Sequence, residues 1–433
     1  MRARLGTIFQ SLKVRNYRLF ATGQITKLVG VWMQFTAQDW LVLELSNNSA
    51  QAVGVVTALQ FAPVLLLTLY GGKLADRHDK RTILIIANST FSVLALGLGL
   101  LVATGAVTLI WVFVFAALMG VANAVETPVR QAFASEMVGR ELLPNALALS
   151  AATFNSARVI GPALAGLAIQ FVGLGPVFLL NTLTYLASML GLARMRTSEL
   201  HRMPRNATDT RIREGLRYVS KRDDLLMPML LILVVGLAGF NFQLTLAVLA
   251  KTVFHTRPAE FGLLTTALAL GALVGALAGS GRRARPSVWI VLFAGVGFGV
   301  LETVVGLAPT FLLTALLLIP TGFFMIYFMQ AANQRLQLGT DATYQGRVMA
   351  LFILVFAGTS PVGAPVIGWL SEQYGPRLGI WGGGAVSLLA ALVALGWQLR
   401  RSNARIRLRL SPMPKFYVVL PPAEAPSPVT VAG

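Results

Sequence analysis

Several ionisable side chains fall inside long apolar stretches of the sequence, where a charge is costly unless it has a partner or a function. Among them are Lys27, Asp39, Glu126 and Arg158. Asp39 has no opposite charge four residues away, and a carboxylate in an apolar setting tends to take up a proton. We therefore expect Asp39 to bind and release a proton, with a capping or outer-gate role as the alternative.

Glu126 is the second proton-coupling candidate. It precedes Arg130 by four residues, and side chains at this spacing on a helix can form an ion pair. A purely structural pairing therefore competes with a proton role for Glu126. Arg158 is expected either to pair with one of the acids or to attract an anionic substrate. Glu302, near the end of an apolar stretch, is expected to be solvated.

Polar side chains also recur on one face of the first apolar stretch. Gln24, Lys27, Gln34 and Gln38 follow one another in steps of three, seven and four residues, which keep them together on a helix. This pattern predicts that the face lines a wet cavity. Further candidates for the cavity are Asn123, Asn155, Asn241, Gln243, Tyr327, Gln330 and Asn333. With neighbouring aromatic residues, they suit a bulky, partly apolar small molecule.

The composition indicates what holds these residues in place. The chain of 433 residues is 55% hydrophobic and 12% charged, with a mean hydropathy of +0.69, whereas soluble domains carry about 25% charged residues. A membrane helix needs about 20 apolar residues. We predict an all-α membrane protein with twelve transmembrane helices near residues 19–45, 52–72, 82–104, 108–134, 144–171, 175–194, 225–250, 259–280, 287–306, 309–334, 346–371 and 377–399.

The charge distribution predicts the orientation of these helices. The net charge is +19, and most of the Lys and Arg residues fall in alternate connections between the predicted helices and in the two terminal segments. This is the positive-inside pattern. It predicts cytoplasmic termini in a cell (inner) membrane, and it explains the basicity without nucleic acid. We expect a monomer in the lipid bilayer.

An internal repeat divides the chain. A shift of 203 residues lays Gly72 on Gly275 and Gln131 on Gln334, and a shift of 202 lays "GPALAG" on "GAPVIG". Parallel repeats of this kind place a binding site between the two halves. We expect a bundle in residues 1–194, a basic linker in 195–224, a second bundle in 225–400 and a disordered tail in 401–433. The linker stretch "TRIREGLRYVS" is either an amphipathic helix on the membrane surface or a solvated connection.

Two motifs carry a resemblance to a known family. The stretch "GGKLADRHDKR" at residues 71–81 resembles the signature loop between the second and third helices of the major facilitator superfamily. The residues that match are Gly72, Leu74, Ala75, Asp76, Arg77, Lys80 and Arg81, whereas Asp79 stands where glycine is usual. "ARVIGPALAG" is similar to the fifth-helix motif of antiporting exporters through Gly161, Pro162 and Gly166. The opening residues look like the drug and siderophore exporter branch.

This resemblance implies two six-helix bundles, alternating access and export of a siderophore or drug-like molecule as a proton antiporter. It also places the second helix beside the eleventh, so that Asp76, Arg347 and the amides after Gly346 would form a cytoplasmic latch when the cavity faces outward. The alternative is that the charges of the loop only set the topology. A proton-coupled importer, a receptor and a lipid scramblase remain alternative functions.

The residues that other classes of protein require are absent from this sequence. The sequence has no G-x-x-x-x-G-K-[ST] loop of a nucleotide-driven pump and no cysteine for a thiolate site. Its three histidines lie in or near predicted loops without a catalytic pattern. We therefore expect no enzyme, no catalytic residue, no metal and no cofactor, with the proton gradient as the driving force.

Overall fold

The computed structural model describes residues 9–201, 212–280, 282, 284–341, 343–402, 405–409 and 415–419. These residues are nearly all helical. The first part of the chain contains η1 (Gln10–Lys13), α2 (Arg15–Leu45), α3 (Ala50–Arg77), α4 (Lys80–Ala103), α5 (Leu109–Val172), α6 (Leu174–Ala193) and η2 (Thr197–Glu199). The second contains α7 (Ile212–Ser220), α8 (Asp223–Ala238), α9 (Phe242–Val248), η3 (Leu249–Val253), α10 (Pro258–Ser280), α11 (Val288–Leu307), α12 (Phe311–Gly339), α13 (Gln345–Tyr374) and α14 (Pro376–Ser402).

Two local breaks divide longer helical stretches. Gly139 has a φ of 69° inside α5, a conformation that glycine adopts without steric cost, so α5 comprises two helices joined at a kink. Residues 239–241 separate α8 from α9, and η3 continues α9 as a π-helical turn. Both breaks allow a run of helical residues to change direction within the molecule.

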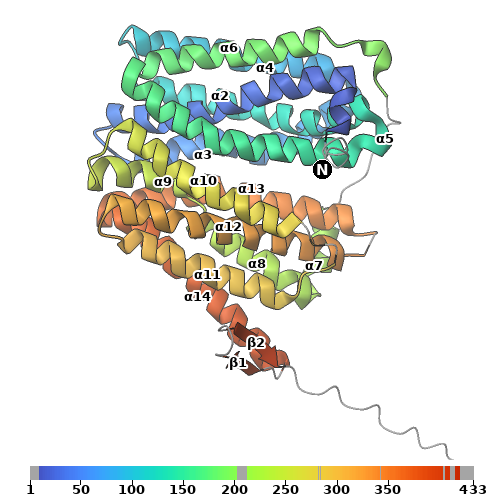
Figure 1. The fold of residues 1–433 in the computed structure, drawn as a ribbon, viewed down its shortest axis with the longest axis vertical. Coiled ribbons are helices and arrows are strands. Elements are labelled where there is room, and N and C mark those ends of the chain that lie inside the picture. Colours follow the sequence, from blue (N-terminus) through green and yellow to red (C-terminus); the bar gives the residue numbers. More distant parts are fainter. Residues whose placement is uncertain are drawn as a thin grey trace, which may run out of the picture.

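The helices lie side by side and their ends gather at two faces (Figure 1). α2 to α6 pack against one another, α8 to α14 do the same, and α3 and α5 contact α13 and α10 between these groups. We call one face the basic end: the connections at 78–79 and 284–287, the residues from 194 to 201 and the short helix α7 lie there. The opposite end carries the connections at 46–49, 173, 254–257 and 375.

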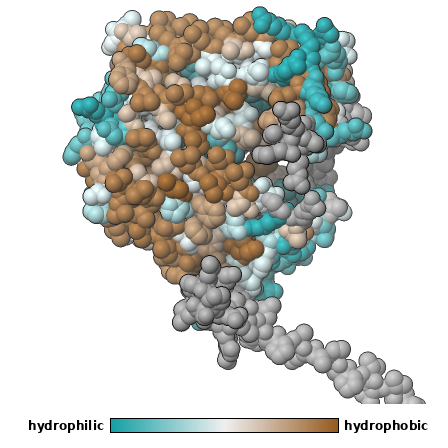
Figure 2. Space-filling view, viewed as in Figure 1, coloured by the Kyte–Doolittle hydropathy of each residue, from teal (hydrophilic) through white to brown (hydrophobic). Residues whose placement is uncertain are grey.

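The surface is apolar between these two ends. Figure 2 shows hydrophobic side chains over the middle of the molecule and hydrophilic residues towards its left and right edges. Large side chains such as Leu66 and Phe171 are 75% and 77% exposed, as lipid-facing residues should be. Within the described residues, ten helices are long and apolar enough to cross a membrane. The predicted membrane protein is confirmed at this level.

α2 and the second part of α5, residues 140–172, are not among these ten helices. α2 buries Lys27, Asp39 and several amide side chains, which lower its mean hydropathy. These polar residues face other helices rather than lipid. The sequence-based prediction counted both segments as transmembrane, and their lengths match those of the neighbouring helices.

The linker contains the expected short helix, α7. It packs on α13, where a Cβ at Gly215 would meet the backbone of Arg347, and Val219 is buried while Leu216 is exposed. The helix therefore docks on protein through one side, whereas its sequence had left the membrane surface and solvent as alternatives.

The structure describes parts of the tail that we expected to be disordered. α14 continues to Ser402, and β1 (Arg405–Arg409) pairs with β2 (Lys415–Val419) in antiparallel register, with Arg407 opposite Tyr417. The sequence "RIRLR" alternates charged and apolar residues, which is the period of a strand. Residues 420–433 lie outside the described part of the chain.

Candidate functional site

A buried charge network joins α2 to α5. Lys27 Nζ lies 2.7 Å from Glu126 Oε1, and Arg130 Nε lies 3.1 Å from the same oxygen. The side chains of Lys27 and Glu126 are each 4% exposed. The expected Glu126–Arg130 pair is confirmed, and Lys27 is a second cation that the sequence spacing could not show. Two cations on one carboxylate stabilise the charged form of Glu126, so this network acts as a helix connector.

The polar stripe of α2 is buried rather than exposed to a wet cavity. Gln34 accepts a hydrogen bond from Asn181 on α6 and donates one to the Met119 sulfur on α5. Gln34 and Gln38 are 3% and 1% exposed. The helical period correctly placed these residues on one face, but their partners lie on other helices and could not be identified from α2 alone.

Asp39 is fully buried at the boundary between the two groups of helices. Neither of its carboxylate oxygens has a hydrogen-bond partner of good geometry among the described residues. The side chain that lies against it is Gln243 of α9, whose own amide nitrogen is also unpaired within the described chain. A carboxylate without a donor or a cation is more stable when it binds a proton. This setting suits a proton-binding group.

Arg158 lies in the second part of α5 with its guanidinium carbon 5.6 Å from the centre of the Trp32 ring. Phe154 packs against the same ring at a centroid distance of 5.7 Å. Within the described chain, no acidic residue lies within 4.0 Å of Arg158, and none of the ion pairs there includes this arginine. Of the two expectations for Arg158, pairing with an acid is therefore not found, and the cation remains available to an anion.

The remaining cavity candidates divide into two groups. Tyr327 stacks on Phe323 at 5.3 Å, lies under the Arg282 guanidinium at 4.2 Å, and is followed by Gln330 and Asn333 on the same helix, α12. Asn123 accepts a hydrogen bond from Thr127, Asn155 donates to the carbonyl of Ala151, and Asn241 donates to that of Leu237. The three asparagines therefore satisfy local groups of their own helices.

The signature turn is built by helix caps and ion pairs. Asp79 accepts hydrogen bonds from the Thr82 amide at 2.8 Å and from its hydroxyl at 2.9 Å, so it caps the start of α4. Lys80 pairs with Glu136 of α5 at 2.6 Å, and Arg81 donates to the last carbonyls of α6. The aspartate in place of the usual glycine is thus an N-cap, which favours a tight turn.

The other residues of the turn have different environments. A Cβ at Gly71 would meet the backbone of Ala124 on α5, whereas Gly72 has no neighbour within 4 Å of such an atom. Leu74 packs in the apolar cluster at this end, and Arg77 has interactions within the molecule. The side chain of Asp76 is outside the described part. Arg347, its expected partner, forms an ion pair with Glu214 of α7 at 3.1 Å, so the latch stays a prediction.

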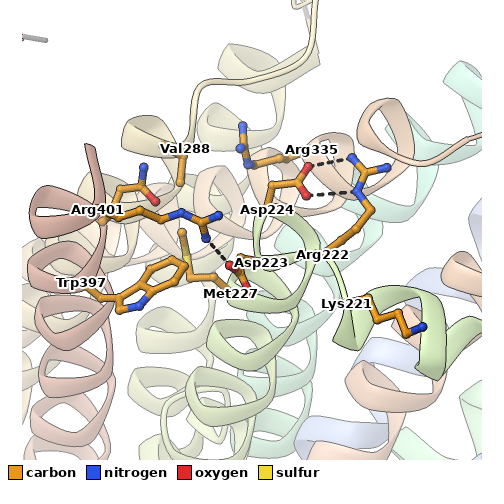
Figure 3. A pocket seen from close by; sticks show the side chains of 10 residues that line it. Lys221, Arg222, Asp223, Asp224, Met227, Val288, Arg335, Trp397 and Arg401 are labelled. Atoms are coloured by element: carbon orange, nitrogen blue, oxygen red, sulfur yellow. Dashed lines mark hydrogen bonds and ion pairs between the residues drawn. The ribbon is translucent and has the colours of Figure 1, made fainter. Parts of the chain in front are cut away.

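A second charge cluster joins the helices that follow the linker. Asp223 pairs with Arg401, and Asp224 accepts from Arg222 at 2.9 Å and from Arg285 at 2.6 Å. Figure 3 shows Arg222, Asp223, Asp224 and Arg401 beside a pocket of about 400 Å³ at the basic end, between α8, α11, α12 and α14. The hydrogen bonds that Arg222 donates to the Asp224 carboxylate raise the pKa of Arg222 above its ordinary value. The pocket is lined by ion pairs within one group of helices and does not reach Arg158 or Asp39.

Glycine contacts bring the two groups of helices together near the opposite end. A Cβ at Gly166 of α5 would meet the backbone of Pro258 and Ala259 on α10. At the position related by the repeat, Gly368 of α13 lies in the same way against Ala50 and Gln51 on α3. Glycine permits such close helix contacts. Gly161, in contrast, packs against Trp32 of α2, and the Pro162 carbonyl faces Gly262.

Glu302 was expected to be solvated, and this prediction is wrong. The residue is 2% exposed and its carboxyl lies against Gly239, at the end of α8, and Ser387 of α14. Its Oε2 atom has no hydrogen-bond partner among the described residues. The position of Glu302 near the end of α11 suggested contact with solvent, but α8 and α14 cover this part of the helix. Small residues at 239, 383 and 384 on those helices were the sequence signal for a close approach.

Similarity to known proteins identifies the family of this chain. A model of the transmembrane secretion effector family matches residues 7–432. The chain belongs to this family of major facilitator transporters. It is similar to the staphyloferrin A transporter of Staphylococcus aureus, with 26% identity over 60% of this chain and 66% of that protein. It is also similar to the enterobactin exporter EntS of Citrobacter koseri, with 25% identity over 83% of this chain and 86% of that protein.

Two further similarities concern function and fold. The multidrug efflux pump Tap of Mycolicibacterium fortuitum is 27% identical over 82% of this chain and 89% of its own length. A bacterial homologue of the lysosomal transporter Spinster, in an inward-facing conformation, matches with a TM-score of 0.70 and 14% identity over 90% of this chain and 97% of that one. This chain is therefore a multi-pass membrane transporter and not an enzyme.

Proposed function

We propose that this protein exports a bulky, partly apolar organic anion of the siderophore class by alternating access, as a proton antiporter. The observation that carries the proposal is the pair of symmetry-related crossings at Gly166 and Gly368, which join the two groups of helices near one end. Rocking about such a boundary is how repeat-built transporters alternate access.

The proposal includes twelve transmembrane helices in two six-helix bundles, residues 1–194 and 225–400. Ten helices meet the requirements of length and hydropathy. α2 and residues 140–172 complete the set, because a helix that buries its polar residues against other helices needs less apolar surface. The positive-inside pattern assigns the basic end, both termini and the linker to the cytoplasm.

The closed end is then the outer one. Besides the glycine crossings, Glu372 of α13 accepts hydrogen bonds from the Ser49 hydroxyl at 2.6 Å and from the Gln51 amide at 2.9 Å at the start of α3. At the basic end, Gly72 and Gly346 have no neighbours within 4 Å of an added Cβ. This difference supports an inward-facing conformation, in which the predicted latch between Asp76 and Arg347 is released.

The chemistry of two cations that lie over aromatic rings supports an anionic substrate. Arg158 lies over Trp32 and Arg282 over Tyr327, and a cation on an aromatic ring can bind a carboxylate or a phenolate while its ring contacts apolar groups. The similarity to two proteins named for siderophores agrees with this class, and the similarity to a multidrug pump makes drug-like molecules the main competitor.

Arg158→Gln tests this proposal with a matched control. In cells that overproduce the protein, export of enterobactin should fall about tenfold or more when Arg158 is replaced, since a charged hydrogen bond contributes about 1.5–3 kcal/mol. Arg196→Gln removes an exposed cation that already pairs with Glu199 and should leave export unchanged. Equal export by Arg158→Gln and the parent, with loss of resistance to a cationic drug instead, would contradict the siderophore class.

A further inference from the structure

Glu302 occupies a place built for a carboxyl group. A Cβ on Gly239 would meet Glu302 Oε2 at 2.7 Å and the Ser387 hydroxyl at 2.7 Å. Gly383 also leaves room, because a Cβ there would approach Glu302 Oε1 at 3.5 Å. Any larger side chain at Gly239 would therefore have to displace the carboxyl. Three helices, α8, α11 and α14, together form the site.

The site lies at the break between α8 and α9. Gly239 ends α8, and the Asn241 amide donates to the carbonyls of Leu237 at 2.9 Å and Ala238 at 3.4 Å. The last carbonyls of α8, which have no partner within the helix, are thus satisfied by one side chain. α9 then carries Gln243 to Asp39. Two buried acids therefore lie beside the break, Asp39 from the first group of helices and Glu302 from the second.

No cation neutralises Glu302 in the described chain. The charged groups on the helices that surround it are Arg377, Arg400 and Arg401 on α14, Arg335 on α12, and Asp223 and Asp224 on α8. Arg377 donates to the carbonyls of Gly306 and Ala308, Arg335 to that of Pro286, and Arg401 pairs with Asp223. An ionised Glu302 would thus be buried without a counter-charge, which is costly, and a bound proton removes this cost.

We propose that Glu302 is a second proton-binding site, and that release of its proton opens the break at residues 239–241 to water. The ionised carboxylate needs more donors than the single Ser387 hydroxyl that lies beside it, and water entering beside Gly239 and Asn241 would supply them. This inference rests on the proposed proton-coupled transport, to which it adds a site in the second group of helices. The proton moves between the carboxyl of Glu302 and water, and no other bond changes.

Infrared spectroscopy of the purified full chain in lipid tests protonation directly. Acidification of the sample should produce the C=O stretching band of a protonated carboxyl. In an Asp39→Asn background this band should remain, and it should disappear when Glu302→Gln is added. Glu199→Gln, which removes an exposed and paired carboxylate, is the control and should not change it. An identical band with and without Glu302→Gln would overturn the proposal.

A labelling experiment tests the opening of the break and separates this inference from transport. The chain has no native cysteine, so Asn241→Cys can be labelled alone with a water-soluble maleimide. The labelling rate of this cysteine is measured with native Glu302 and with Glu302→Gln, and the ratio of the first rate to the second should rise severalfold with pH. Ionisation of the thiol affects both rates equally and cancels in the ratio. A ratio that is independent of pH would overturn the opening even if transport is confirmed, and a rising ratio without any transport would refute only the proposed function.

Discussion

At the scale of single residues, two buried acids of the first group of helices have opposite environments. Glu126 contacts two cations within 3.1 Å, whereas neither oxygen of Asp39 has a partner of good geometry among the described residues. A paired carboxylate connects helices, and an unpaired one is free to exchange a proton. The structure thus separates two roles between which the sequence had left Glu126 undecided.

Replacing Glu126 should destabilise the protein more than replacing Lys27. Glu126→Gln leaves Lys27 buried without its partner, which costs about 3–5 kcal/mol in buried ion pairs. Lys27→Met should cost less, because Arg130 still neutralises Glu126. Thermal unfolding in detergent should give this order, with Glu199→Gln within about 0.5 kcal/mol of the parent. A larger loss for Lys27→Met than for Glu126→Gln would contradict this account of the network.

Asp39→Asn should uncouple transport from the proton gradient. The amide keeps the shape of the side chain but cannot exchange a proton, so gradient-driven accumulation in vesicles should stop while exchange of substrate between the two sides continues. Counterflow of labelled enterobactin measures the exchange. Undiminished accumulation by Asp39→Asn would show that another group carries the proton.

At the scale of helices, closure of the end opposite the basic end depends on close backbone contacts between helices. Gly166→Leu should strain the contact with Pro258 by about 1–3 kcal/mol, as overpacking does, and only in the conformation that closes this end. The predicted result is faster maleimide labelling of Ile169→Cys, which is 7% exposed in this conformation. Gly396→Leu on α14, where an added Cβ has no neighbour within 4 Å, should leave the labelling rate unchanged. Equal rates for the two variants would exclude Gly166 from the closure.

The helices themselves were predictable from sequence to a greater extent than their contacts. The apolar helices, the kink at Gly139 and the linker helix follow from local sequence patterns. The repeat anticipated the correspondence between Gly166 and Gly368. The partners of Lys27, Gln34 and Arg347 lie more than 80 residues away in sequence, where no helical period reaches. Glu302 shows the same limit, because its burial is caused by α8 and α14 rather than by α11.

At the scale of the whole molecule, the orientation in the membrane is a separate prediction. Reporter fusions after Arg213 should give a cytoplasmic signal and those after Thr256 an external one, because the basic end carries most cations outside the helices. An external signal at Arg213 would contradict the assignment of the basic end to the cytoplasm and with it the inward-facing interpretation.

The central claim is that the protein moves an organic anion out of the cell in exchange for protons, and inverted membrane vesicles test it most directly. Vesicles that contain the protein and have an acidic interior should accumulate enterobactin, lose it when a protonophore is added, and accumulate none when Asp39→Asn replaces the parent. Accumulation of enterobactin equal to that of vesicles without the protein would contradict this claim, whether or not the drug-like cation ethidium is accumulated.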